Sequence, residues 1–154
     1  MNKSKIALGL DIGARRIGVA RGDLEVRLAS PLTAIFNDET VMDEIAKIIF
    51  DTKSSLIVIG LPRDNNGQET EQSKFCRDFA HDLKMILENR DFDVEIILQD
   101  ESLTSVIAED NLRSRKNFDE KMLRDGTLDS EAAVIILQDY LENSKRSEND
   151  FAKN

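Results

Sequence analysis

Residues 6–20 read Ile-Ala-Leu-Gly-Leu-Asp-Ile-Gly-Ala-Arg-Arg-Ile-Gly-Val-Ala, and this stretch decides the fold. The pattern is typical of two β-strands joined by a tight turn flanked by glycine. Side chains alternate along a strand, so the first strand presents two unlike faces. One face carries Ile6, Leu8, Leu10 and Ile12, and the other carries Ala7, Gly9, Asp11 and Gly13.

Asp11 is the first candidate functional residue, because it is the one charged residue among these small neighbours. A carboxylate on a central strand is costly unless something compensates its charge. Neighbours without bulk leave room for a cation, a phosphate or another backbone segment to approach. The alternative interpretation is that Asp11 lies at a strand end and only accepts hydrogen bonds from turn amides.

Composition narrows the class of protein. The chain has 154 residues, of which 40% are hydrophobic and 33% charged, and this suits one domain with a single core. We find neither a cleavable leader nor an apolar run of about 18 residues, so we expect a cytoplasmic protein with no membrane association. Cys76 and His81 are the only cysteine and histidine, which excludes an internal disulfide and a Cys/His zinc set. Any metal is therefore expected to be bound by oxygen.

The formal charge of −9 disfavours broad, non-specific adhesion to nucleic acid, because 30 acidic residues outweigh 21 basic ones. A local basic groove remains compatible with this charge. Basic residues cluster in two places, at Arg15, Arg16, Arg21 and Arg27 and again at Arg113, Arg115 and Lys116. Each cluster is either a nucleic-acid contact or an ordinary solvated surface.

The order of predicted elements changes from a meander to an α/β pattern. Short connections predict that strands at 16–22 and 26–36 continue an antiparallel meander. A helix over 38–52 follows, with Asp38 as its expected cap. The continuous apolar run 56–61 predicts a strand buried on both faces, with a parallel neighbour. After a polar loop come a second helix and a strand at 94–98, and the helix's predicted apolar stripe is Phe75, Phe79, Leu83, Ile86 and Leu87.

Two acidic residues, Asp100 and Glu101, follow the strand at 94–98. Adjacent residues of a strand face opposite ways, so only one of the two can share a site with Asp11. The alternative is that both acids simply provide favourable charge at the start of the next helix. We expect Ser102 or Thr104 to cap that helix, and its predicted apolar residues are Val106, Ile107 and Leu112.

The end of the chain contains a third candidate acid. A charged stretch at 113–126 predicts a mobile connector, and a last helix is predicted over about 128–142. Helical spacing places Asp129 on the same stripe as Ala133, Ile136 and Tyr140, so it faces inward. The alternative role of Asp129 is to compensate the helix dipole. We expect one domain over 1–142 and a polar, flexible tail over 143–154.

With this order of elements, the chain resembles the YqgF/RuvX family of small ribonuclease-H-like nucleases. The resemblance covers roughly residues 5–142. Its five motifs are Leu-Gly-Leu-Asp-Ile-Gly-Ala-Arg-Arg-Ile-Gly-Val-Ala (8–20), Ala-Ser-Pro-Leu-Thr (29–33), Ile-Gly-Leu-Pro (59–62), Asp-Glu-Ser-Leu-Thr (100–104) and Asp-Ser-Glu-Ala-Ala-Val-Ile-Ile-Leu-Gln (129–138). It implies an α/β, ribonuclease-H-like fold, with a mixed five-stranded sheet flanked by helices. Strands 1–3 would form an antiparallel meander, followed by parallel strands.

The resemblance also implies roles for individual residues. Asp11, Glu101 and Asp129 match the acids of the family and would act as catalytic residues that bind Mg²⁺ or Mn²⁺. Arg15 and Arg16, across the turn from Asp11, are the candidate nucleic-acid contacts. The family usually has Arg where this chain has Ser102, and Ser cannot replace a bidentate guanidinium.

The implied activity is phosphodiester hydrolysis in processing of the 5′ end of pre-16S rRNA. One alternative is a Holliday junction resolvase acting on branched DNA, and another is a non-catalytic scaffold that kept the fold. Leu-Asp-Ile-Gly (10–13) before a hairpin is also similar to the phosphate loop of actin-like and sugar-kinase ATPases, which close two such domains over a nucleotide. We expect nucleic acid as partner and a monomer or weak homodimer.

Overall fold

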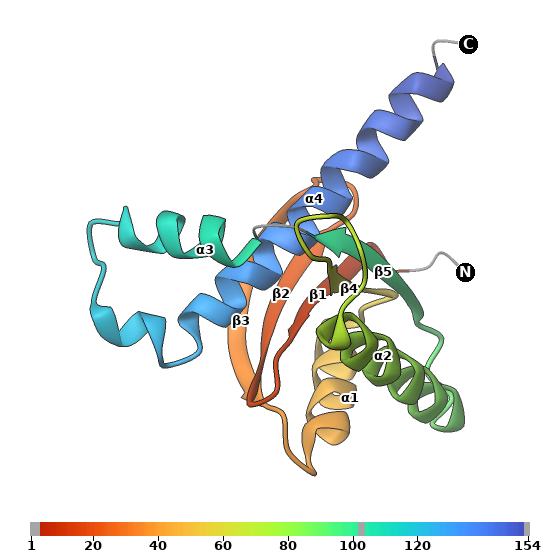
Figure 1. The fold of residues 1–154 in the computed structure, drawn as a ribbon. Helices are drawn as coiled ribbons and strands as arrows, with labels where there is room; N and C mark the ends of the chain where they lie inside the picture. Colours follow the sequence, from red (N-terminus) through yellow and green to blue (C-terminus); the bar gives the residue numbers. More distant parts are fainter. Residues whose placement is uncertain (1–3, 102–103, 153–154) are drawn as a thin grey trace.

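The computed structural model describes residues 4–101 and 104–152. One mixed sheet of five strands forms its centre, in the order β3-β2-β1-β4-β5. β1 pairs antiparallel with β2 and parallel with β4, β2 pairs antiparallel with β3, and β4 pairs parallel with β5. The elements (Figure 1) are β1 (Ile6–Ile12), β2 (Arg16–Asp23), β3 (Leu28–Phe36), α1 (Val41–Thr52), β4 (Leu56–Pro62), α2 (Glu71–Asn89), β5 (Glu95–Glu101), α3 (Thr104–Arg113), the 3₁₀ helix η1 (Glu120–Leu123) and α4 (Thr127–Ala152).

The predicted fold class is confirmed: a meander of three strands is followed by two parallel strands, and helices cover both faces. In Figure 1, α1 and α2 lie on one face of the sheet and α4 crosses the other. No helix among the described residues is long and apolar enough to cross a membrane.

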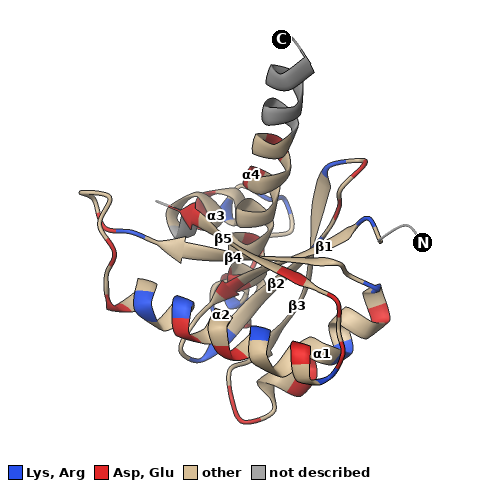
Figure 2. Ribbon diagram, turned by 90° about the vertical axis from the view of Figure 1, so that its right-hand side faces the viewer, with Lys and Arg blue, Asp and Glu red and all other residues tan. Residues whose placement is uncertain are grey.

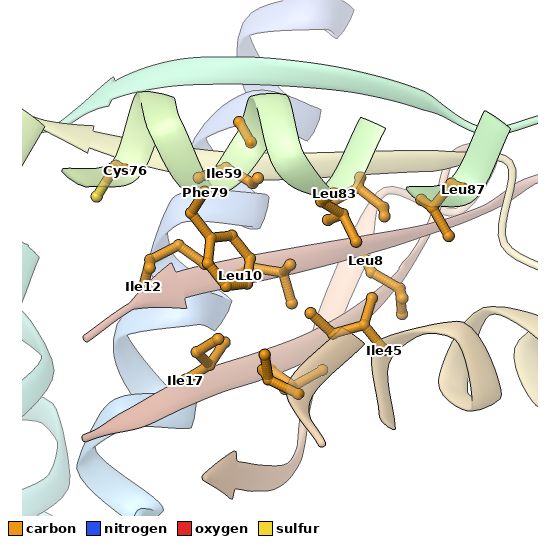
Figure 3. Packing of buried hydrophobic residues seen from close by; sticks show 14 of the residues in the cluster. Leu8, Leu10, Ile12, Ile17, Ile45, Ile59, Cys76, Phe79, Leu83 and Leu87 are labelled. Atoms are coloured by element: carbon orange, nitrogen blue, oxygen red, sulfur yellow. The ribbon is translucent and has the colours of Figure 1, made fainter. Parts of the chain in front are cut away.

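The two faces of β1 enter different cores, as its alternating sequence predicts. Leu8, Leu10 and Ile12 are buried in the larger cluster, between the sheet and helices α1 and α2, and Figure 3 shows them meeting Phe79 and Leu83 of α2. The small residues face α4 instead. There Ala7 and Ala20 pack with four buried apolar side chains of α4, those of Ala133, Ile136, Leu137 and Leu141.

Glycines on this second face let α4 lie directly on the sheet. A β-carbon at position 18 would lie 1.8 Å from the carbonyl oxygen of Asp129, and one at position 9 would lie 2.8 Å from that of Ala133. Real β-carbons do not approach other atoms so closely. The sequence left room beside Asp11 for a cation, a phosphate or another backbone segment. In the structure a backbone segment, the first turns of α4, packs against this face.

Some helix boundaries differ from the sequence prediction. α1 begins at Val41 rather than at residue 38, and Asp38 instead accepts hydrogen bonds from the backbone N–H and hydroxyl of Thr40, at 2.9 and 2.6 Å. α4 continues to Ala152, so the predicted helix end at 142 was wrong. The stretch 113–126, predicted as a mobile connector, contains the 3₁₀ helix η1. Ser102 and its expected capping role lie outside the described residues.

The apolar stripes of two helices were also misassigned in part. Phe75 on α2 is exposed, whereas Phe79, Leu83 and Leu87 are buried as predicted. On α3, Val106 and Ile107 are exposed, and the buried side chains are Ala108 and Leu112. Periodicity identified these helices but did not identify which of their faces is covered.

The contact between Gly18 and α4 makes a stability prediction. Gly18→Ala should lower the free energy of unfolding by roughly 1–3 kcal/mol or more, because the added methyl meets rigid backbone. Chemical denaturation measures the change. The control is Gly67→Asn, at a glycine with φ +77° where an added β-carbon would have open space around it, and where asparagine tolerates the left-handed conformation. Equal stability of the Gly18→Ala variant and the wild type would contradict this packing.

Candidate active site

Asp11 and Asp129 are brought together by strand register and helix packing. Asp11 lies near the carboxyl end of β1, directly opposite Gly18 of β2. The backbone of Asp129, in the first turn of α4, rests on Gly18. Residues paired across antiparallel strands lie about 5 Å apart, so Asp129 enters the site as the immediate neighbour of Asp11.

Local hydrogen bonds hold the start of α4 in this place. Asp125 accepts from the backbone N–H of Thr127 at 3.0 Å and from its hydroxyl at 2.6 Å. The buried Ser130 hydroxyl donates to the carbonyl of Leu32 at 2.6 Å and accepts from the N–H of Val19 at 3.3 Å. The Ser130 bonds tie the helix to β2 and β3, and the Asp125–Thr127 bonds fix the turn that leads into it.

Glu101 reaches the same face of the sheet from the end of β5. Its carboxyl carbon lies 2.9 Å from where a β-carbon of Gly60 would be, so the carboxylate lies over β4, the strand between β5 and β1. Asp100 faces the other way and accepts a hydrogen bond from Nε of Arg63 at 3.0 Å. The two adjacent acids are separated as strand alternation predicts, and Glu101 is the one that joins Asp11.

The electrostatics report the proximity of the three acids. Burial, followed by the negative charges of Glu101 and Asp129, raises the pKa of Asp11 to about 7. Burial also raises the pKa of Asp129, while the nearby positive charge of Arg16 lowers it. A carboxyl group that holds its proton to near neutrality reports first its burial and then the negative charge of its neighbours, and a bound cation would offset both.

The donor set fits a hard divalent cation, because it consists of carboxylate oxygens. Within residues 4–101 and 104–152, no three Asp, Glu, His or Cys side chains converge closely enough to hold a metal ion as they stand. The reason is the sheet order: β4 separates β1 from β5, so the strands of Asp11 and Glu101 lie about 10 Å apart. Glu101 spans part of this gap over Gly60.

The two candidate nucleic-acid contacts, Arg15 and Arg16, have different surroundings. Arg15 is exposed at the turn between β1 and β2. Arg16 is half-buried, and its guanidinium carbon lies 5.6 Å from the centre of the Phe36 ring. Its positive charge partly opposes the burial that raises the pKa of Asp129, and it adds a little to the Thr127 hydrogen bonds that lower the pKa of Asp125, so Arg16 belongs to the acid cluster whereas Arg15 faces solvent.

One ion pair next to the site was missed by sequence reasoning. Glu131 of α4 is buried and pairs with Arg115, from the segment after α3. Arg115 belongs to the second basic cluster. In the sequence, the one sign of this ion pair was the acidic residue Glu131, two positions after Asp129 in the last motif.

The cysteine and the histidine both lie on α2, away from this ion pair. Cys76 is buried and His81 is exposed. Burial raises the pKa of the Cys76 thiol to about 12, as expected for a packed, inert thiol.

The raised pKa of Asp11 predicts how stability depends on pH. An unfolded aspartate releases its proton near pH 3.8, whereas folded Asp11 keeps it to about 7. The wild type therefore loses stability as pH rises across this window, and the loss is complete above the folded pKa. Asp11→Asn removes this charge, so it should raise the free energy of unfolding by roughly 1–3 kcal/mol at pH 8 and by much less at pH 4.

Thermal melts in EDTA at several pH values measure this difference. The matched control is Asp23→Asn, at the last residue of β2, where the carboxylate accepts backbone hydrogen bonds that lower its pKa. That variant should gain no stability at pH 8. If the difference in stability between Asp11→Asn and the wild type were the same at all pH values, the charge cluster would be refuted.

The sequence is similar to those of known proteins along most of its length. A profile of the family described as "RuvX: Holliday junction resolvase" matches residues 5–143. A protein of Sulfurihydrogenibium sp., named as a pre-16S rRNA nuclease, is 44% identical over 137 residues, which are 88% of each chain. A Fusobacterium nucleatum protein with the same name is 37% identical over 139 residues, covering 90% of this chain and 97% of its own.

Solved structures agree on the fold at low sequence identity. Thermus thermophilus RuvC in complex with a Holliday junction substrate has a TM-score of 0.56 at 9% identity, covering 91% of this chain and 96% of its own. The fowlpox virus Holliday junction resolvase has a TM-score of 0.54 at 11% identity, covering 90% and 99%. These likenesses support the ribonuclease-H-like fold, and the match over residues 5–143 together with the relatives means that the chain belongs to the RuvX family.

Proposed function

We propose that this protein is a divalent-cation-dependent nuclease that processes the 5′ end of pre-16S rRNA in the cytoplasm. The observation that carries the proposal is the approach of three carboxylates from distant parts of the chain on one face of the sheet, with the pKa of Asp11 raised by burial and by its two acidic neighbours. A fold that needed only stability would not bring like charges together in this way.

In this proposal Asp11, Glu101 and Asp129 are the catalytic residues and would hold Mg²⁺ or Mn²⁺. A divalent cation bound there would supply activation of water and stabilisation of the leaving 3′ oxygen. The chain's own contribution is placement: Gly18 of β2, the cross-strand partner of Asp11, lets the backbone of Asp129 rest on the sheet, and Gly60 leaves the space over β4 that Glu101 occupies.

The names of the curated relatives favour pre-16S rRNA as the substrate. A second candidate is a Holliday junction, favoured by the family description and by the junction-bound structural neighbour. A resolvase makes two symmetric cuts, which requires paired sites in a dimer. RNA trimming requires one site, and a monomer or weak homodimer satisfies it. A third alternative, a non-catalytic scaffold, predicts no cleavage of either substrate.

The first test separates catalysis from binding. Asp11→Asn should lower cleavage at least about a hundredfold, because it removes a charged oxygen ligand, while nucleic-acid affinity stays level or rises as repulsion of phosphate falls. Cleavage of a pre-16S rRNA fragment and of a four-way DNA junction would be measured in the same buffer, alongside binding in EDTA. Asp100→Asn is the control, because Asp100 faces away from the site toward Arg63.

The same assay tests the cation and the scaffold alternative. Cleavage should require Mg²⁺ or Mn²⁺, stop in excess EDTA, and be weak with Ca²⁺, which is larger and looser in its geometry. Cleavage by Asp11→Asn at the wild-type rate would overturn the nuclease proposal. Absence of cleavage by the wild type, with binding retained, would support the scaffold.

A second test concerns the two arginines. Arg15→Ala should weaken nucleic-acid binding and reduce the salt dependence by about one phosphate contact, with the turnover of bound substrate unchanged. Arg16→Ala should change turnover as well, because Arg16 contributes positive charge beside Asp129. Affinity would be titrated at several salt concentrations. Identical behaviour of the two variants would contradict their separate assignment.

A further inference from the structure

β3 is an exposed sheet edge with none of the usual charge protection. Among the described strands it pairs only with β2, and its sequence, Leu-Ala-Ser-Pro-Leu-Thr-Ala-Ile-Phe (28–36), contains no charged residue, so Figure 2 draws it in tan throughout. Natural edge strands are commonly guarded by lysine, proline or inward charges. β3 has Pro31 alone, which leaves residues 32–36 able to accept a further strand.

Large apolar side chains are exposed around this edge. Leu28 and Phe36, at the two ends of β3, are 66% and 58% exposed, and Val26, just before β3, is 65% exposed. Single exposed apolar residues are normal, but three on and beside one edge strand are typical of an interaction surface.

A groove of about 620 Å³ runs between β3 and α1. Its apolar lining includes Leu32, Ile35 and Ile48. Three carboxylates, those of Asp38, Glu44 and Asp51, face one basic side chain, Lys47. Glu44, Lys47, Ile48 and Asp51 follow helical spacing, so they belong to a single face of α1. The groove is therefore apolar inside and acidic along its border.

This charge pattern decides between possible occupants. An acidic border repels the phosphates of a nucleic acid. A second copy pairing β3 with β3 would bring two such borders together, each on a chain of net charge −9. A polypeptide strand with basic and aliphatic side chains fits all three features. Its backbone would hydrogen-bond to the open edge of β3, its aliphatic side chains would pack on the apolar lining, and its basic side chains would pair with the acidic border.

We propose that an extended, basic segment of another protein binds here as a sixth strand beside β3, with its aliphatic side chains in the groove. The inference goes beyond the proposed function and does not rest on it. The occupant would contact Phe36, whose ring lies against Arg16. Arg16 is the residue whose charge reaches Asp129, so the docking surface adjoins the acid cluster.

The test uses a short, fluorescein-labelled peptide in which lysine and valine alternate, with a glutamate–valine peptide as its opposite. The full chain should bind the first and not the second. Glu44→Lys with Asp51→Lys should weaken binding about tenfold, by the usual strength of two exposed charge pairs. Asp78→Lys with Asp82→Lys, an equal charge change on exposed positions of α2, should leave affinity near the wild-type value.

Two further measurements establish that the peptide adds a strand. Hydrogen exchange of the backbone amides of residues 32–36 should slow when the peptide binds. Thr33→Lys, at an exposed position of the edge, should weaken binding while thermal melts show an intact fold. Equal weakening by the α2 pair, or unchanged exchange in β3, would overturn the proposal. So would a dimer in sedimentation that Thr33→Lys abolishes, because the occupant would then be a second copy.

Discussion

The contact of the α4 backbone with glycine on β2 is the constraint on which the rest of the site depends. A strand glycine is unfavourable by itself, because it has no side chain to pack and loses more backbone entropy on folding. Here the absence of a side chain at Gly18 allows a main-chain carbonyl of α4 to rest on the sheet. The position of Asp129 therefore follows from backbone geometry, which is more rigid than any side-chain packing.

The same principle extends across the sheet to Glu101. β4 separates the strands of Asp11 and Glu101, and a side chain at position 60 would occupy the space where the Glu101 carboxylate lies. The cost of burying a carboxylate, and of placing two others beside it, is visible in the raised pKa of Asp11. The larger core on the opposite face, under α1 and α2, is formed by aliphatic and aromatic side chains. The main hydrophobic packing and the three acids therefore lie on different faces of one sheet.

Local pattern was enough to predict the order of elements and the face of Asp11, because strand alternation is a property of neighbouring residues, and the ribonuclease-H-like fold was predicted from the family resemblance. The reason for the small residues around Asp11 could not be predicted, since it depends on α4, more than 100 residues away in the sequence. Helical spacing did not reveal that Val106 and Ile107 are exposed. Periodicity shows which residues share one side of a helix, but it does not show whether another element packs against that side. The helix end predicted at 142 was wrong for a simpler reason: residues 127–152 contain neither Gly nor Pro to stop α4.

The net charge of −9, taken alone, argues against a nucleic-acid substrate, yet the structure distributes that charge unevenly. Part of it lies in Asp11, Glu101 and Asp129, where a bound divalent cation would reverse the local sign that a phosphate meets. Another part lines the groove beside β3, where, under the docking proposal, it disfavours nucleic acid and favours a basic polypeptide. Under the proposed function Arg15, exposed at the turn beside the acids, is placed to meet an arriving phosphate. An acidic chain can thus act on an acidic polymer, because attraction is needed only at the site and repulsion elsewhere limits where the polymer binds.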